Sequence, residues 1–530
     1  MFDQSRLFRW LGTLGMFFML SGSASASPQG PRCHPVQQVE ARQLLSDGRQ
    51  AEAPVGLSAS LTRSTGTLPD CMTAEDIRAV MRRWQDALME RGWATSRVLV
   101  PPQDLSSGVL QLLVLPGQVG SIRTEPQDAR ILLGAVLPLA PGDPLDLRVL
   151  EQAVENLRHL PTVEARILMH PGNAPGVSDL EVHWSQDKPW RLVLGADNSG
   201  SRETGRYQGS TTLALDNPLA ISDRLQFTGT RDLGGGIDRR RGNRSASLHY
   251  SAPVGYWLLN LDASRQRHHQ NVTGATTDYS YNGRSQQQEL GVAHTLWRSG
   301  AGQSRWSAGL FARQSENFID DTEVEVQRRR VGGWKAGWRH EQQLGAFKLV
   351  GHLQYRRGTH ALGGQPAPEE AYGEGSHFFR VWNGSLQVDG ATRWAGLAWT
   401  WQGEWRRQIH RTPLTQQDRF SLGGQTSVRG FDGEQTLAAE RGWLVRQEMG
   451  VGPQDSAHQG FVAFDQGRVS GPSAQWLAGQ ALAGMALGVR GRWAGDVSWT
   501  YELSAGRPLR KPELLTTAPV AWAFSLQTEF

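Results

Sequence analysis

The C-terminal part of the chain alternates between apolar and polar residues, and this alternation constrains the fold more than any other feature. From Arg191 to Phe530 helical periodicity nearly vanishes, and short segments of period two follow one another. In one of them Phe347, Leu349, Leu353 and Tyr355 interleave with Lys348, His352, Gln354 and Arg356. Alternation of this kind puts successive side chains on opposite faces of a β-strand. The tract is therefore predicted to be a sheet with one apolar and one polar face.

Two kinds of sheet show such alternation. A soluble sandwich packs its apolar faces into a core, whereas a membrane barrel turns them toward lipid. The segments are about nine to eleven residues long, which is the length that a tilted spanning strand requires. Their charged faces suit a water-filled lumen. About 340 residues, at roughly 20 per strand and connection, predict a transmembrane antiparallel β-barrel of about 16 strands.

Tryptophan is abundant, with 20 residues, of which 15 follow position 190. Its amphipathic ring collects at membrane interfaces, although sugar-binding proteins are also rich in it. The formal net charge is +4, and the basic residues are spread along the whole chain. Nucleic-acid-binding proteins gather such residues in a patch, so no nucleic-acid partner is expected.

The N-terminus is typical of a secretory signal. Arg6 and Arg9 precede an apolar stretch from Leu11 to Leu20, and Ala24-Ser25-Ala26 provides small residues for cleavage. A membrane anchor helix is the alternative, but about ten apolar residues cannot cross a core about 30 Å thick. We expect a signal peptide at residues 1–26.

Residues 33–187 show a different, mixed pattern. Thr73 and Asp76 form a capping box before apolar residues at helical spacing, and the helix should end at Gly92. A second helix is expected over about 147–160. Short strands are expected at Arg97–Val100, Val109–Leu115, Val163–Met169 and Leu180–Trp184. Two small α+β units follow from this pattern.

Cys33 and Cys71 are the two cysteines of the chain. An isolated pair in an exported protein indicates a disulfide, because a metal or redox site would need closer spacing or histidines nearby. Such a bond would help a unit too small to bury a large core.

Several of these stretches resemble the transporters of two-partner secretion, which export filamentous haemagglutinins and haemolysins. Gly92-Trp-Ala-Thr-Ser-Arg97 with Pro102-Gln-Asp-Leu105 resembles the first periplasmic POTRA domain of that family, and Pro141-Gly-Asp143 with Gly176-Val-Ser-Asp179 resembles the second. Asp197-Asn-Ser-Gly200 and Asp216-Asn-Pro218 resemble the start and first turn of the barrel. The resemblance implies POTRA domains at residues 27–120 (with a short N-terminal lead) and 121–188, and a barrel at 189–530.

The most specific part of the resemblance is a pair of motifs. Val428-Arg-Gly-Phe431 matches the tip of a loop that folds back into the lumen, here around residues 421–435. Phe464, Asp465 and Gly467 match the motif on the barrel wall where the tip docks. The resemblance implies that Arg429 pairs with Asp465. The alternative is a turn arginine in solvent.

The terminal strand adds a further sign. Val520, Trp522, Phe524, Leu526 and Phe530 share one face, and the terminal aromatic Phe530 resembles the signal by which outer-membrane proteins reach the barrel assembly machinery. Many members of the family that the chain resembles carry an N-terminal helix that plugs the pore. Here only about six residues separate the predicted cleavage site from Cys33, so we expect no such helix, and either the Arg429 loop alone blocks the lumen or the pore is leakier than usual.

Catalytic motifs are absent from the sequence: there is no His-Glu-x-x-His, Gly-x-Ser-x-Gly or Gly-x4-Gly-Lys. We expect neither an enzyme nor a cofactor. His268-His269 has no acidic or cysteine partner nearby in sequence, so no metal site is expected, and Arg239–Arg241 suggests a loop in solvent or facing lipopolysaccharide.

The expected function is secretion of a large exoprotein partner, bound through the POTRA domains, across the outer membrane of a Gram-negative bacterium. The alternatives are an assembly factor for other barrels and a passive porin.

Overall fold

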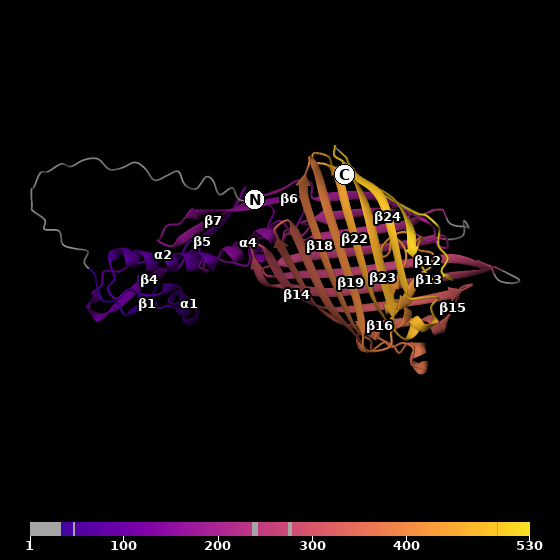
Figure 1. The fold of residues 1–530 in the computed structure, drawn as a ribbon, viewed down its shortest axis with the longest axis horizontal. Coiled ribbons are helices and arrows are strands. Elements are labelled where there is room, and N and C mark those ends of the chain that lie inside the picture. The colour runs from indigo at the N-terminus through magenta and orange to yellow at the C-terminus, as the bar shows by residue number, and fades with distance from the viewer. Residues whose placement is uncertain (1–32, 46–47, 236–241, 274–277, 496) are drawn as a thin grey trace, which may run out of the picture. The chain divides into compact units, whose positions relative to one another are not determined.

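The computed structural model describes residues 33–45, 48–235, 242–273, 278–495 and 497–530 (Figure 1). The predicted signal peptide at 1–26 and the arginines at 239–241 lie outside these ranges. The chain divides into two compact units, one ending at Pro116 and one beginning at Gly117. This boundary lies four residues before the one drawn from the sequence between the POTRA domains, because the strand that starts at Gln118 belongs to the second sheet.

The first unit contains one mixed sheet and two helices. The sheet has the order β2-β1-β4-β3, with β1 parallel to β4. The strands are β1 (Gln38–Leu44), β2 (Gln50–Glu52), β3 (Arg97–Leu99) and β4 (Val109–Leu115), and the helices are α1 (Val55–Thr65) and α2 (Ala74–Glu90). Trp84 of α2, fully buried, packs with Leu61 of α1 and with Leu110 and Leu112 of β4. This apolar contact holds the helices on the sheet.

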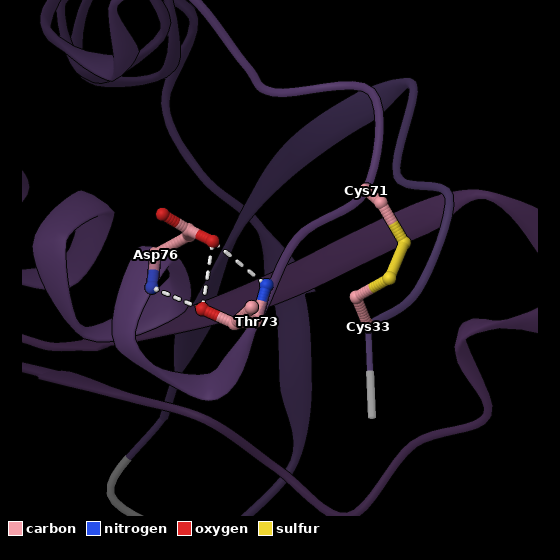
Figure 2. Close-up of a disulfide and its surroundings, with 4 residues drawn as sticks. All are labelled: Cys33, Cys71, Thr73 and Asp76. Atoms are coloured by element: carbon pink, nitrogen blue, oxygen red, sulfur yellow. Dashed lines mark hydrogen bonds between the residues drawn. A yellow bond between two sulfur atoms is a disulfide. The ribbon is translucent and has the colours of Figure 1, made fainter. Parts of the chain in front are cut away.

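The start of α2 shows why the local sequence forms a helix there. Thr73 accepts a hydrogen bond from the Asp76 N–H (3.3 Å), and the Asp76 carboxylate accepts one from the Thr73 N–H (2.8 Å). These reciprocal bonds satisfy backbone donors that the first helical turn leaves free. The bonds that the Asp76 carboxylate accepts from the Thr73 N–H and hydroxyl lower the pKa of Asp76. Figure 2 shows this capping box beside the disulfide between Cys33 and Cys71, whose Cα atoms are 5.3 Å apart.

The second unit begins with a smaller domain. Its sheet has the order β5-β7-β6, with β5 parallel and β6 antiparallel to β7. The elements are β5 (Gln118–Glu125), α3 (Leu133–Val136), α4 (Leu147–Leu157), β6 (Val163–Pro171) and β7 (Val177–Gln186). Asp146 caps α4 by accepting from the Arg148 N–H. Leu157 of α4 is buried against Val182 and Trp184 of β7.

The remainder of the second unit is a closed barrel of 16 antiparallel strands. They are β8 (Trp190–Asp197), β9 (Tyr207–Asp216), β10 (Arg224–Gly234), β11 (Gly242–Val254), β12 (Trp257–Thr273), β13 (Asp278–Ser299), β14 (Gly302–Ile319), β16 (Arg329–Leu344), β17 (Phe347–Thr359), β18 (Arg380–Trp394), β19 (Leu397–His410), β22 (Arg441–Pro453), β23 (Gln459–Ser470), β24 (Ala481–Trp493), β25 (Ser498–Arg510) and β26 (Ala521–Glu529). Figure 1 shows these strands tilted alongside one another.

The barrel closes where β26 pairs with β8, over the register from Ser525–Asp197 to Glu529–Val193. β15 (Thr322–Glu323) pairs with β14 alone in the described part of the sheet. β19 pairs directly with β22, so that β20 (Phe420–Leu422) and β21 (Leu437–Ala439), between them in the chain, form a separate small sheet. The prediction of a closed antiparallel barrel of about 16 strands is confirmed.

The expected strand length of about nine to eleven residues is wrong for much of the barrel. β12 has 17 residues, β13 has 22 and β14 has 18. The apolar alternation covers only part of each strand, and hydrogen bonding continues through polar stretches such as 285–288. Because pairing does not require apolar side chains, the strands extend beyond the part that alternation identifies.

The barrel carries its apolar residues on the outside. Outward-facing side chains that are more than a third exposed include Trp257, Leu259, Leu261, Leu290, Leu310, Trp334, Leu353, Trp405, Leu503 and Trp522. Trp306 and Trp338 stand directly opposite each other on β14 and β16, and Trp257 lies edge-on to Trp306 with ring centroids 5.7 Å apart. Aromatic rings beside an apolar band are the arrangement of a barrel in a bilayer. Of the helices that the structure describes, none is long and apolar enough to span a membrane.

Candidate functional site

The loop between β19 and β22 folds into the barrel. Its two short strands, β20 and β21, pair from Phe420–Ala439 to Leu422–Leu437. Between them Val428 and Phe431 are buried in a cluster with inward-facing residues of the wall. The members of this cluster that come from the wall strands are Leu444, Val469 and Leu482. The wall is thus apolar on its inner face where the loop packs, and burial of these side chains holds the loop.

The tip of this loop places Arg429 on Asp465 of β23. The guanidinium donates from Nε to Oδ2 and from Nη2 to Oδ1, both at 2.7 Å, and the Arg429 N–H donates to Oδ2 at 2.9 Å. The Asp465 side chain is fully buried and that of Arg429 is 13% exposed. A two-pronged contact of this kind fixes both distance and orientation. The two residues that the resemblance paired therefore lie together.

Further charges extend this contact into a network that the sequence did not indicate. Arg429 Nη1 also pairs with Glu448 of β22, and Glu448 pairs with Arg490 of β24. Arg446 lies 3.8 Å from both Asp465 and Glu404. Alternating polar positions on the inner faces of β22 and β24 were the only sequence signal for these residues. Their partners belong to distant strands, so only the fold identifies them.

Glycines of the wall make room for the tip. A Cβ on Gly484 would lie 2.0 Å from the Arg429 carbonyl oxygen, and one on Gly506 would lie 2.9 Å from the Gly430 Cα. Gly430 itself has φ +98°, a conformation that glycine adopts without strain. The backbone of the tip therefore touches the backbone of β24 and β25 directly.

The wall motif divides between the two faces of β23. Asp465 and Gly467 face inward, and a Cβ on Gly467 would lie 2.8 Å from the Leu422 side chain. Phe464 faces outward and is 43% exposed. Because successive residues of a strand alternate, Phe464 cannot contact the loop and belongs to the apolar outer surface.

The loop also contacts the seam between the first and last barrel strands. Gln425 donates to the Asn198 side-chain oxygen at 3.2 Å. Asn198 in turn donates to the Trp522 carbonyl (2.8 Å) and accepts from the Phe524 N–H (2.9 Å). At the other end of the seam the Phe530 N–H donates to the Leu192 carbonyl at 3.0 Å. Phe530 is thus part of the pairing that closes the barrel.

The small domain of the second unit contacts the barrel through polar side chains. Asn217, in the turn after β9, donates to the Arg130 carbonyl at 2.7 Å. Asn156 of α4 donates to the Gly255 carbonyl, in the turn after β11, at 2.6 Å. Glu155 of α4 pairs with Arg298 and Arg305 of the barrel. The small domain therefore lies at the end of the barrel that contains the turns after β9 and β11.

His159 lies in the same contact. Its Nε2 is 3.0 Å from the Ser251 hydroxyl. Burial lowers the pKa of His159 to about 4, and the nearby Arg224 and Arg305 act in the same direction. The imidazole is therefore neutral at neutral pH.

A polar cavity lies beside the loop tip inside the barrel. Its lining includes Asp389, Gln402, Glu404, Arg446 and Arg490, together with Arg429. Such a lining suits a water-filled lumen. The described residues contain no group of three or more His, Cys, Asp or Glu placed to hold a metal, and His268 and His269 point to opposite faces of β12.

Comparison with known proteins gives the family. The family described as haemolysin secretion/activation protein ShlB/FhaC/HecB matches residues 176–491. A POTRA domain of the ShlB type matches residues 60–117, and a further POTRA domain matches residues 118–171.

Individual relatives agree. The outer membrane transporter CdiB-2 of Burkholderia pseudomallei is 30% identical over 468 residues, covering 87% of this chain and 79% of its own. The hemolysin transporter protein ShlB of Serratia marcescens is 25% identical, covering 81% of this chain and 74% of its own.

Solved structures of similar fold belong to transporters of the same kind. CdiB from Escherichia coli superimposes with a TM-score of 0.83 at 26% identity, covering 96% of this chain and 93% of that one. CdiB from Acinetobacter baumannii gives 0.79 at 25% identity, covering 95% and 91%. The chain therefore belongs to the haemolysin secretion/activation family of two-partner secretion transporters, with its barrel in the outer membrane and its POTRA domains in the periplasm.

Proposed function

We propose that this transporter captures one large unfolded exoprotein through its POTRA domains and passes it through the lumen past the Arg429 loop. Some relatives are named as hemolysin transporter proteins, which supports a protein cargo. The main support for this proposal is the contact of Arg429 with the buried Asp465. Because this ion pair holds the loop inside the lumen, any chain that passes through the lumen has to pass the loop.

Capture would use the free edges of the small sheets. In the second domain β6 pairs with β7 on one side, and its outer part exposes Leu168 and Met169. An unfolded chain can add a strand to such an edge, since backbone pairing gives affinity with little dependence on sequence. The exposed apolar side chains would add specificity.

Passage would use the polar inner surface. Extended polypeptide needs hydrogen-bonding partners for its backbone wherever water is excluded, and the cavity beside the loop tip has such partners on several strands. Folding of the cargo outside the cell would remove unfolded chain from the equilibrium and draw export forward. Export of a cargo whose distal part cannot fold should therefore stall.

Phe530 would serve insertion of the barrel itself. Its backbone completes the pairing of β26 with β8, and its ring is 40% exposed. We assign it as the signal read by the barrel assembly machinery. Phe530→Ala should lower the amount of barrel in the outer membrane while leaving the activity of each inserted barrel unchanged.

The test of export compares Arg429→Ala with Arg339→Ala. Arg339 is also an inward-facing arginine, but it pairs with Glu341 of its own strand, β16, and does not line the cavity beside the loop tip. Proteomics of culture supernatant, at matched barrel levels, should show one large polypeptide falling with Arg429→Ala and holding steady with Arg339→Ala. A joint fall of many outer-membrane barrels would instead identify an assembly factor. Unchanged export in both variants would refute a role for the loop.

A further inference from the structure

Four arginines stand in one row across the outer surface of the barrel. The strand register places Arg231 of β10 opposite Arg244 of β11, Arg244 opposite Arg267 of β12, and Arg267 opposite Arg284 of β13. All four arginines face outward. Phe227 lies four residues from Arg231 and Leu261 lies six residues from Arg267, so each shares a face with the arginine of its strand. Both of these apolar side chains are exposed on the outer surface. Arg265 lies two residues below Arg267 on the same face. We call these five residues the arginine row.

Most of the positive charges in the arginine row are not neutralised by acidic side chains among the described residues. Like charges directly opposite each other on neighbouring strands destabilise a sheet. Glu316 of β14 follows Arg284 in the register and pairs with Arg284, and lies 3.8 Å from Arg330. Arg231, Arg244, Arg265 and Arg267 form no ion pair with any other residue that the structure describes. An external anion would stabilise these four charges.

The distance of the arginine row from the periplasmic end of the barrel, measured across the membrane, indicates which anions lie beside it. Ten residues of β12 separate Trp257, beside the periplasmic turn, from Arg267. At about 3.3 Å per residue and a tilt near 40°, they rise about 25 Å, which is the height of the apolar band of an outer-membrane barrel. The row therefore stands at the level of the outer-leaflet headgroups.

The surface around the row has room for a headgroup. Arg231, Arg244, Arg267 and Arg284 line one surface depression together with His268, His269, Phe318 and two acidic residues, Asp232 and Asp321, so four arginines outnumber the carboxylates there. Below it the register continues from Arg265 to Ala246 and Gly229. A Cβ on Gly229 would meet no atom within 4 Å, so the surface beneath the guanidinium groups is open.

We propose that the arginine row binds the phosphate groups of a phosphorylated glycolipid of the outer leaflet, with its acyl chains lying on the apolar belt below. Guanidinium groups bind phosphate oxygens in a two-pronged geometry. The row crosses three strand spacings, about 14 Å in all, so it accommodates a headgroup with more than one phosphate. The lipid would hold this side of the barrel in the outer leaflet, independently of cargo export.

The test measures lipid binding to the purified full-length barrel in detergent by native mass spectrometry. The probes are diphosphoryl lipid A, its monophosphoryl and dephosphorylated forms, inorganic phosphate and an acidic peptide. Diphosphoryl lipid should bind tightest and the dephosphorylated form weakest. Equal binding of all three lipids, or binding of the acidic peptide in preference to lipid, would overturn the proposal, and so would binding of inorganic phosphate as tight as that of the lipid.

Variants locate the site. Arg267→Gln should weaken binding of the diphosphoryl lipid by about tenfold, because one charged hydrogen-bonding group is lost. Arg407→Gln is the matched control: Arg407 also faces outward, on β19, but its cross-strand neighbours are Gly384 and Trp443. Arg244→Gln provides a second variant if Arg267→Gln does not fold. Equal losses in the row variants and the control would contradict a specific site.

Discussion

The backbone N–H and the guanidinium of Arg429 both donate to one carboxylate, that of Asp465, which is fully buried. The side-chain contact fixes the arginine, and the backbone contact fixes the chain at the loop tip. Asp465 thus anchors the loop tip at two points, in addition to the apolar packing of Val428 and Phe431 against the wall.

Asp465→Asn should release the loop tip. The amide keeps the size of the side chain but removes the charge that offsets Arg429, and loss of one partner of a buried pair costs about 3–5 kcal/mol. A cysteine placed at the buried Val428 should then react with a thiol reagent more than tenfold faster than in the parent. Asp262→Asn is the control, because Asp262 pairs with His249 on the neighbouring strand β11 and does not line the cavity beside the tip, and equal rates in all three barrels would show that the pair does not hold the loop.

Gly484→Ala should displace the tip by steric conflict. The new Cβ would lie 2.0 Å from the Arg429 carbonyl oxygen, so the loop has to move away from β24. We expect higher ion conductance in planar bilayers. Gly460→Ala, where the new Cβ would have its nearest neighbour at 3.8 Å, should leave conductance unchanged; if Gly484→Ala also conducts like the parent, the close packing is not required for closure.

Glu155→Gln should loosen the second POTRA domain from the barrel. Arg298 and Arg305 both pair with this carboxylate, and hydrogen bonds to charged groups contribute about 1.5–3 kcal/mol. Backbone amides of α4 should exchange hydrogen faster in the full-length protein. Glu164→Gln, at an exposed position on β6 of the same domain, should not change the exchange, and a similar effect of both changes would point to the stability of the domain rather than docking.

The same contact should weaken in acid through His159. Its pKa is about 4 in the folded protein, against an ordinary value of 6.5. Above pH 6.5 both folded and opened states are neutral, so the full stability is present. As pH falls from 6.5 toward 4 the opened state binds a proton that the folded state excludes, which costs up to about 3 kcal/mol. Opening of α4, measured by hydrogen exchange with correction for intrinsic rates, should increase over this range in the parent and far less in His159→Gln.

The amino-acid sequence predicts one part of this fold and does not predict the other. Alternation from Trp257 to Ala263 predicts an outer apolar face correctly, because side-chain direction in a strand is a local property. The ends of β12 and β13 were not predicted, because their residues are polar and do not alternate with apolar ones. The backbones of polar residues form the hydrogen bonds of a sheet as readily as those of apolar residues. Among the small domains, β1, β5 and α1 lack clear periodicity, and their burial depends on packing against α2 and α4.

The candidate site divides in the same way. The motifs containing Arg429 and Asp465 were visible in the sequence, and the structure brings these two residues together. Glu448 and Arg490 were missed because their partners come from other strands, and Phe464 was grouped with the docking residues although strand parity turns it outward. Local spacing identifies a motif, while the fold decides which of its members share a face.

The central claim is that cargo travels through the lumen, and site-specific photocrosslinking tests it most directly. Gln354 and Leu353 are neighbours on β17, but Gln354 belongs to the inward polar face, whereas Leu353 faces outward and is 44% exposed. With a photocrosslinking residue at either position during active export, we predict that position 354 crosslinks to a large secreted polypeptide and position 353 does not. Crosslinks to that polypeptide at 353 alone, or at neither position while export continues, would contradict passage through the barrel.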